Sequence, residues 1–400
     1  MHDLSGGSTA AVGWVTFASF IPFVVVGPIA GAMADRVQRR KVLIAGGTFG
    51  VVGAIVLAFA TALDLAQVWH VGVLAFATGS AQAITVPTRQ ALVATSVPRS
   101  HLTNAVALSG LSQHGSRLAG PLFGAAFLST LGVSAVFAVA AVLLAFALFC
   151  AFRVGSEANE ASRMAAETVP VGDQEPKGAI AAAITTLSAD LKAALRYIAA
   201  DRRLLTVIGM VGAHCSFTMA FDSMLPALSD KVGGSEGLYG SILIALGGGA
   251  LVGTLGVSQL QKASTRAASF VASGIASGLS IALLGVATSP SLVLPAAVLA
   301  GISQASYMAL SATLVQGVVA DRFRARVMSF YIMIAAGHMA ILNLGFGQFA
   351  EVVEVRVLLV VPGLIWVALF LGLVLVLPEA RSVAVRGRFT HDDEVASTPV

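Results

Sequence analysis

Residues 31–41 read Gly-Ala-Met-Ala-Asp-Arg-Val-Gln-Arg-Arg-Lys, and they stand directly between two long apolar stretches. Gly31 at the start of this segment lets neighbouring helices approach closely. Asp35 supplies the negative charge that the positive N-terminus of a following helix attracts. The basic cluster fixes the orientation of the flanking helices and pairs with acids or lipid headgroups. Its members include Arg36, Arg40 and Lys41. Such a turn between two apolar segments predicts that both segments cross a membrane.

The composition extends this interpretation to the whole chain. Of the 400 residues, 57% are hydrophobic and only 11% are charged, with a mean hydropathy of +0.88. Soluble domains carry about 25% charged residues, so this chain cannot cover a water-facing surface. The charge-free stretches reach the ~20 residues of a transmembrane helix and lack the alternation of barrel strands. The sequence therefore predicts an all-α integral membrane protein.

Eleven membrane-spanning helices are predicted from these stretches. They cover residues 9–34, 42–63, 68–88, 104–130, 133–152, 204–228, 238–260, 266–288, 291–316, 327–350 and 357–377. All but three of the 24 Lys and Arg residues fall in alternate loops, the exceptions being Arg117, Lys231 and Arg356. Because cytoplasmic loops carry the positive excess, the C-terminus is predicted inside and the N-terminus outside. The basic residues thus set topology, and no nucleic-acid partner is predicted.

A long polar stretch divides five spans from six. The predicted domains are an N-terminal half bundle (1–152), a cytoplasmic linker with an amphipathic helix over 188–203 (153–203), a C-terminal half bundle (204–378) and a cytoplasmic tail (379–400). Val97-Pro98-Arg99 resembles Ala320-Asp321-Arg322 at an offset of 223 residues. Repeated halves are the architecture of many secondary transporters.

The 31–41 segment resembles the loop signature of the major facilitator superfamily, G-x-x-x-D-R-x-G-x-R-K, with Gln38 in place of one glycine. Residues 87–91 and 321–329 resemble the exporter branch that contains siderophore and macrolide efflux proteins and transmembrane secretion effectors. This resemblance, over residues 9–378, implies a fold of two pseudo-symmetric bundles with the first of the usual twelve helices missing. It also implies that the 31–41 segment is a cytoplasmic gating loop.

The span 104–130 loosely resembles the antiporter signature of that superfamily, which marks exporters. Small residues replace three of the signature's five glycines, while Gly120, Pro121 and Gly124 are retained. Small residues allow tight packing where the two halves meet, and Pro121 kinks the helix. The alternative is ordinary small-residue packing.

Polar residues at helical spacing mark three spans, and in this fold the helices concerned line the central cavity. Polar faces within a bilayer are rarely accidental, because hydrocarbon offers them no partners. The predicted cavity residues are Thr78, Gln82, Thr85, His214, Thr218, Asp222, Gln304, Tyr307 and Ser311. The alternative is interhelical hydrogen bonding without a substrate.

Three residues are candidates for proton coupling. Asp222 is the only acid deep inside a predicted span, and a carboxylate in low dielectric can carry a proton. Arg117, with His114 one turn earlier, is the other charged feature; it could bind an anionic substrate, pair with an acid or lock two helices. An arginine that the family carries on its fourth helix is absent, since Ala75 stands there.

The leading hypothesis is a secondary transporter of the bacterial cytoplasmic membrane that exports an amphiphilic small molecule by alternating access, driven by proton antiport. Its predicted partners are the substrate, protons and membrane lipids, and it is expected to work as a monomer. No GxxxxGK[ST] motif supports ATP-driven transport. Neither a cofactor nor a metal is predicted, since Cys150 and Cys215 read as packing residues. A truncated or non-transporting membrane protein is the alternative, and a membrane enzyme is disfavoured.

Overall fold

The computed structural model describes most of the chain. The described residues are 8–34, 39–63, 65–96, 120, 123, 132–153, 192–193, 195–233, 237–260, 262–319 and 321–386. Throughout these ranges the regular structure is helical and no strand occurs. The labelled helices are α1 (Thr9–Ala34), α2 (Arg39–Ala62), α3 (Val68–Ser96), α7 (Arg202–His214), α8 (Leu225–Lys231), α9 (Leu238–Ser258), α10 (Ala263–Val286), α11 (Pro290–Val318), α12 (Asp321–Phe349), α13 (Val355–Val376) and α14 (Pro378–Arg386). A further helix covers Gly132–Arg153.

The predicted spans agree with these helices closely. Within the described ranges, nine helices are long and apolar enough to cross a membrane. The span predicted over 68–88 is the helix α3, which continues beyond Pro87 to Ser96. The span predicted over 104–130 lies outside the described residues apart from two positions, Gly120 and Phe123.

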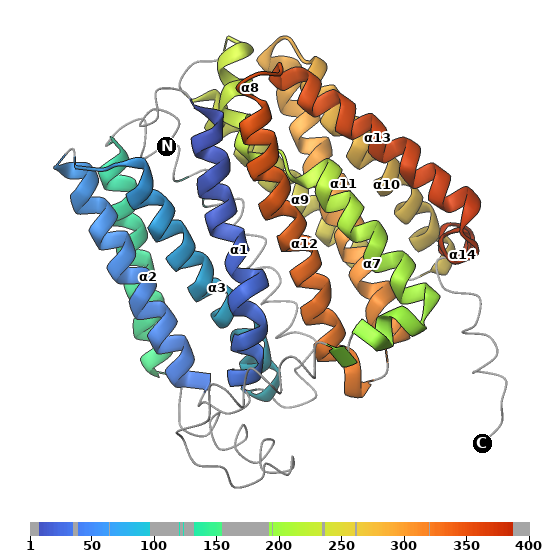
Figure 1. Ribbon diagram of the computed structural model, residues 1–400, viewed down its shortest axis with the longest axis horizontal. Coiled ribbons are helices and arrows are strands. Elements are labelled where there is room, and N and C mark those ends of the chain that lie inside the picture. Colours follow the sequence, from blue (N-terminus) through green and yellow to red (C-terminus); the bar gives the residue numbers. More distant parts are fainter. Residues whose placement is uncertain are drawn as a thin grey trace, which may run out of the picture.

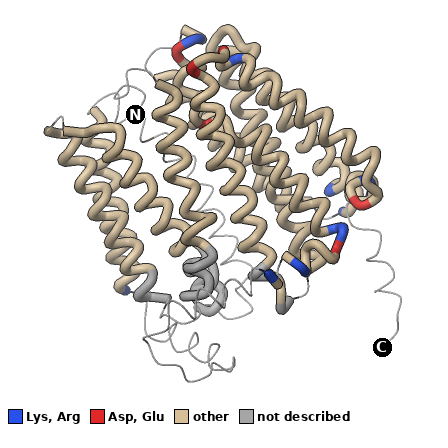
Figure 2. The backbone as a smooth tube through the Cα atoms, viewed as in Figure 1, with Lys and Arg blue, Asp and Glu red and all other residues tan. Residues whose placement is uncertain are grey.

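The helices form two groups, which Figure 1 shows side by side, with α1 of one group next to α12 of the other. The N-terminal group contains α1, α2, α3 and the helix Gly132–Arg153, and the C-terminal group contains α7 to α14. The two groups meet where α1 packs along α12. Among the described residues, the positions of Lys, Arg, Asp and Glu lie mostly towards the two ends of the helices (Figure 2). This is the charge distribution that a bilayer requires.

Helix lengths repeat between the two groups. The helices α2 and α10 both have 24 residues, and α3 and α11 both have 29. Gly132–Arg153 and α13 both have 22 residues and begin 223 residues apart, at Gly132 and Val355. That interval equals the offset between the two loop motifs in the sequence. The repeat therefore extends from a short motif to whole helices.

The predicted span 204–228 is interrupted, which the sequence did not indicate. After α7 the chain forms a π-helical turn, η4 (Cys215–Met219), and a 3₁₀ turn, η5 (Asp222–Met224), before α8 begins. The side-chain amide of Gln304 donates to the carbonyl oxygen of Thr218 at 2.7 Å. The backbone N–H of Ser223 donates to Oδ1 of Asn343 at 3.1 Å. These two amides satisfy backbone groups that a continuous helix would pair internally.

Two segments outside the predicted spans also pack against the C-terminal group. Residues 195–200 are helical, with Ile198 buried in the core and Tyr197 stacked on Phe323. An amphipathic helix on the cytoplasmic membrane surface was predicted here, and its described end packs against the C-terminal group. The segment after Glu379 was predicted as a tail, but it begins as α14, whose Ala380 and Val383 are buried.

Candidate transport site

The two groups meet along a seam that glycines keep narrow. A Cβ atom at Gly13 of α1 would lie 2.9 Å from the carbonyl oxygen of Asn343 in α12. A Cβ atom at Gly347 would lie 2.8 Å from the carbonyl oxygen of Thr9. Nearer the opposite end of the seam, Val24 faces Gly337. The two backbones are therefore almost in contact at one end of the helices, with no side chain between them.

At that end a carboxylate connects the two groups. Oε1 of Glu351, in the α12–α13 loop, accepts hydrogen bonds from Ser8 Oγ at 2.9 Å, Thr9 Oγ1 at 3.3 Å and the Ala10 N–H at 3.1 Å. The N–H groups of a first helical turn have no partners within their helix, and a negative charge there is favourable. We call this arrangement the Glu351 latch and this end of the molecule the latch face.

Hydrogen bonding also affects the ionisation of the latch. The Ala10 N–H and the Ser8 hydroxyl hold the pKa of Glu351 below its ordinary value. Burial acts in the opposite direction and raises the pKa of Glu351, but less than these hydrogen bonds lower it. The second acid of the loop, Glu354, pairs instead with Lys231 of α8 at 3.4 Å, within the C-terminal group.

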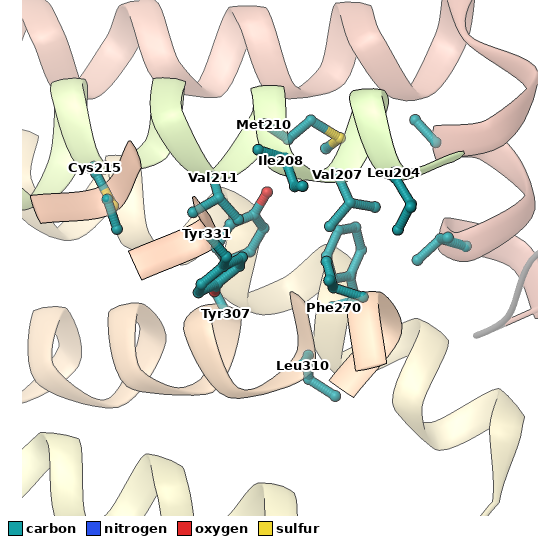
Figure 3. Close-up of a cluster of buried hydrophobic side chains, with 14 of the residues drawn as sticks. Leu204, Val207, Ile208, Met210, Val211, Cys215, Phe270, Tyr307, Leu310 and Tyr331 are labelled. Atoms are coloured by element: carbon teal, nitrogen blue, oxygen red, sulfur yellow. The ribbon is translucent and has the colours of Figure 1, made fainter. Parts of the chain in front are cut away.

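Five predicted cavity residues lie together inside the C-terminal group. They are His214, Thr218, Gln304, Tyr307 and Ser311, and each is at least nine-tenths buried. The ring centroids of His214 and Tyr307 are 4.3 Å apart with nearly parallel planes. Ser311 Oγ and Tyr331 Oη are 3.1 Å apart. Figure 3 shows Tyr307 and Tyr331 next to Val211 of α7 in the same cluster. In this conformation the five residues contact each other and open onto no surface.

Asp222 lies at the interruption and differs from that buried set. It begins η5, is partly exposed and interacts electrostatically with Tyr239 of α9. The turn that carries it packs against α1 and α12, so Asp222 sits beside the seam. The structure thus brings the predicted acid to the place where the two groups meet.

The three polar residues predicted on α3 differ in their hydrogen bonds and in their exposure. The hydroxyls of Thr78 and Thr85 donate to carbonyl oxygens of their own helix, at Leu74 and Ala81. The methyl group of Thr85 packs against Gly46 of α2, whereas Gln82 is exposed. Of these three side chains, Gln82 is exposed, and Thr78 and Thr85 are partly buried.

Several predicted residues lie where the structure describes no side chain. Asp35, Arg36, His114, Arg117, Pro121 and Gly124 fall outside the described residues. Gly31, Arg40 and Lys41 are described as helical backbone positions only. Gly120 is exposed and has no atom within 4 Å of an added Cβ.

The sequence analysis did not single out Glu351 or Asn343. Glu351 looks like an ordinary loop acid, and Asn343 looks like an isolated amide in a span. A polar amide within hydrocarbon is itself a signal, because it needs a partner. Among the described residues, no group of three or more His, Cys, Asp or Glu side chains could hold a metal ion.

An assembly of apolar helices in two repeated groups, joined along one seam, is the architecture of a multi-pass membrane transporter. The chain belongs to the transmembrane secretion effector family of the major facilitator superfamily, whose family model matches residues 1–398. This is a family of membrane transporters.

Curated relatives are more distant. An uncharacterized MFS-type transporter, YfiS of Bacillus subtilis (strain 168), is 22% identical over 117 residues, which are 29% of this chain and 27% of that protein. Macrolide efflux protein A of Streptococcus pyogenes is 26% identical over 134 residues, 33% of each protein. The matched stretch thus spans a third or less of the length of these relatives.

Solved structures share the fold. A POT family transporter in complex with a thioalcohol-conjugated peptide superposes with a TM-score of 0.65 at 13% identity, covering 93% of this chain and 95% of that chain. The nucleoside transporter NupG superposes with a TM-score of 0.62 at 14% identity, covering 90% and 89%. The predicted all-α fold and family are both confirmed.

Proposed function

We propose that this protein exports an amphiphilic small molecule across the cytoplasmic membrane by alternating access, in exchange for protons. The observation that carries the proposal is the seam, closed at one end by the Glu351 latch and two glycines. Exposed hydrogen bonds and backbone contacts can separate and reform without unfolding either group. The family and the similarity to macrolide efflux protein A support a substrate of this class.

The proposed orientation follows from the charged loops. The basic loops face the cytoplasm, so the latch face, which carries Lys231 and Arg356, is external. The N-terminus as given then lies outside and the C-terminus inside. The described conformation is accordingly closed to the exterior. The rigid bodies that rock against each other are residues 1–152 and 204–378, joined by the 153–203 linker.

The substrate path is proposed between the two groups, beside α3 and the interrupted helix. Gln82 presents an amide from the N-terminal group, and Asp222 presents a carboxylate from the other. The 31–41 loop would act as the gate at the cytoplasmic end. Gly120, Pro121 and Gly124 would kink and pack the helix at the interface, with His114 and Arg117 as further coupling candidates.

Inverted membrane vesicles test the proposal. Radiolabelled erythromycin, a macrolide, serves as the probe, with and without an imposed pH gradient. We expect gradient-dependent uptake into the vesicles, which corresponds to export from the cell. Equal uptake by vesicles with and without the protein would exclude export of this probe and favour a non-transporting membrane partner.

The coupling role is tested by Asp222→Asn, which keeps the shape of the side chain and cannot titrate. We expect gradient-driven uptake to be lost. Equilibrium binding of erythromycin should survive if Asp222 only couples, and should disappear if it contacts the substrate. Asp230→Asn is the control, since Asp230 is an exposed acid at the end of α8. Unchanged uptake by Asp222→Asn at several external pH values would overturn both roles.

A further inference from the structure

Three buried polar atoms inside the C-terminal group have no hydrogen-bond partner among the described residues. They are Nδ1 and Nε2 of His214 and the hydroxyl of Tyr307. Both residues are fully buried, and their rings stack. Burying such a group unpaired costs about 1–3 kcal/mol. Three such atoms on two stacked rings indicate that this part of the interior is not simply an aromatic core without water.

Polar side chains continue from this pair in both directions. On one side are Ser311 and Tyr331, whose hydroxyls are within hydrogen-bonding distance. On the other side, the amide of Gln304 donates to the carbonyl oxygen of Thr218. We call these six residues the interior track. It consists of Tyr331, Ser311, Tyr307, His214, Thr218 and Gln304.

The interior track leads towards the seam. Thr218 is the last residue of the track on the interrupted helix, and Asp222 follows it by four residues. The π-helical turn lies between His214 and Asp222, and the carbonyl oxygen of Thr218 in this turn already bonds to a side chain of α11. The interior track therefore ends four residues before the acid beside the seam.

We propose that the interior track, bridged by bound water, is a proton relay in which His214 carries the proton. The proposal rests on the proton antiport of the proposed function. Buried water characteristically pairs otherwise unsatisfied polar groups. A neutral imidazole accepts a proton at one nitrogen and releases one from the other. The hops run through the hydroxyls, the imidazole and the bound water, while the Gln304 amide only donates a hydrogen bond. Each hop breaks one N–H or O–H bond as the next forms, so one proton moves and no other product results.

The groups that surround His214 suit such a carrier. Tyr307 faces it from α11, and Cys215 follows it in the chain at the start of η4. Tyr331 of α12 lies next to Tyr307 (Figure 3). Trp366 of α13 contacts the imidazole edge-on and Phe270 of α10 stacks on Tyr307, and neither titrates. Asp222, further along the interrupted helix, is the acid to which the proton would pass.

The first test removes one hydroxyl, and so distinguishes a proton relay from ordinary packing of the core. Tyr307→Phe keeps the stacked ring, and Tyr197→Phe is the matched control outside the interior track. Proteoliposomes loaded with pyranine report proton entry while they transport radiolabelled erythromycin. We expect Tyr307→Phe to lower proton entry per transported probe by about tenfold or more, with the control unchanged. Unaltered coupling in Tyr307→Phe would overturn the relay and leave the proposed function standing.

The second test needs no substrate. Protein labelled with ¹⁵N-histidine is compared with His214→Gln to assign the ring signals. A relay requires the ring proton of His214 to exchange with deuterated water within seconds, whereas a dry core would protect it for hours. Protection would overturn the relay whatever the transport assay shows. The ring proton of His214 could also exchange fast in a protein that transports the probe without proton entry. That result would support water in the interior track and would contradict proton antiport.

Discussion

The carboxylate of Glu351 accepts a hydrogen bond from the backbone N–H of Ala10, 3.1 Å away, although the two residues belong to different helical groups. Ser8 caps the same helix end locally, since its hydroxyl accepts from the Ala11 N–H. The first turn of α1 is thus stabilised partly from its own chain segment and partly across the seam. Separating the two groups at the latch face removes the stabilisation that the Glu351 carboxylate supplies across the seam.

Glu351→Gln should weaken closure of the latch face, because it removes the negative charge from the N-terminus of α1. Leu65 and Val352 are both exposed and suit nitroxide labels at this end of the molecule. Electron–electron distance measurements between the two labels should show that the population with the longer distance is about two- to fivefold larger than in the unsubstituted protein. Glu354→Gln is the control, because Glu354 pairs within one group. A larger change in the control would contradict the latch.

The latch should also respond to acid in a defined window. Hydrogen bonds from Ala10 and Ser8 lower the pKa of Glu351 from its ordinary value of 4.5. The contribution of the carboxylate to closure is therefore complete above pH 4.5 and is lost as the pH falls through the lowered pKa. The label distances should stay constant from neutral pH to that value and lengthen below it. A transition near neutral pH, or an equal transition in Glu351→Gln, would contradict this assignment.

Two glycines of α12 offer a matched pair for the seam. A Cβ atom at Gly347 would meet the backbone of α1, whereas at Gly345 it would meet nothing within 4 Å. Gly347→Ala should either force the two helices apart at the seam or, through overpacking, lower the free energy of unfolding by about 1–3 kcal/mol. Gly345→Ala should leave both the label distances and thermal stability unchanged or slightly improved. Equal behaviour of the two variants would show that the helices do not approach so closely.

The interruption in the predicted span 204–228 depends on an amide from another helix. Asn343→Leu leaves the buried N–H of Ser223 without its partner, at a cost of about 1–3 kcal/mol. Thermal unfolding in detergent should shift to lower temperature. Gln348→Leu is the control, because it removes an exposed amide from the same helix. An unchanged midpoint in Asn343→Leu would mean that the interruption is stable without this bond.

The sequence predicts the spans well because every stretch that crosses the hydrocarbon must itself be long and apolar, whatever its neighbours are. The bounds predicted for 9–34 and 238–260 differ from α1 and α9 by two residues at most. The interruption after His214 could not be predicted in this way, because the whole stretch is apolar enough to read as one span. It depends on Gln304 and Asn343, which lie far away along the chain.

The candidate site was predicted only in part, for a related reason. Helical spacing places His214, Thr218 and Asp222 on one face of a single predicted span, whereas the structure divides them between α7, η4 and η5. The first two residues are buried and Asp222 is partly exposed, and the α-helix is interrupted between them. The partner of Glu351 lies more than 300 residues earlier, so no local pattern marks it.

The glycine seam has a consequence for how fast the two groups can move. Where helices meet through interlocked side chains, rotation forces each side chain through a new rotamer. Between Gly13 and Gly347 there are no side chains to rearrange. We expect the opening rate to depend on rehydration of the exposed backbone rather than on repacking, and therefore to vary little with membrane fluidity.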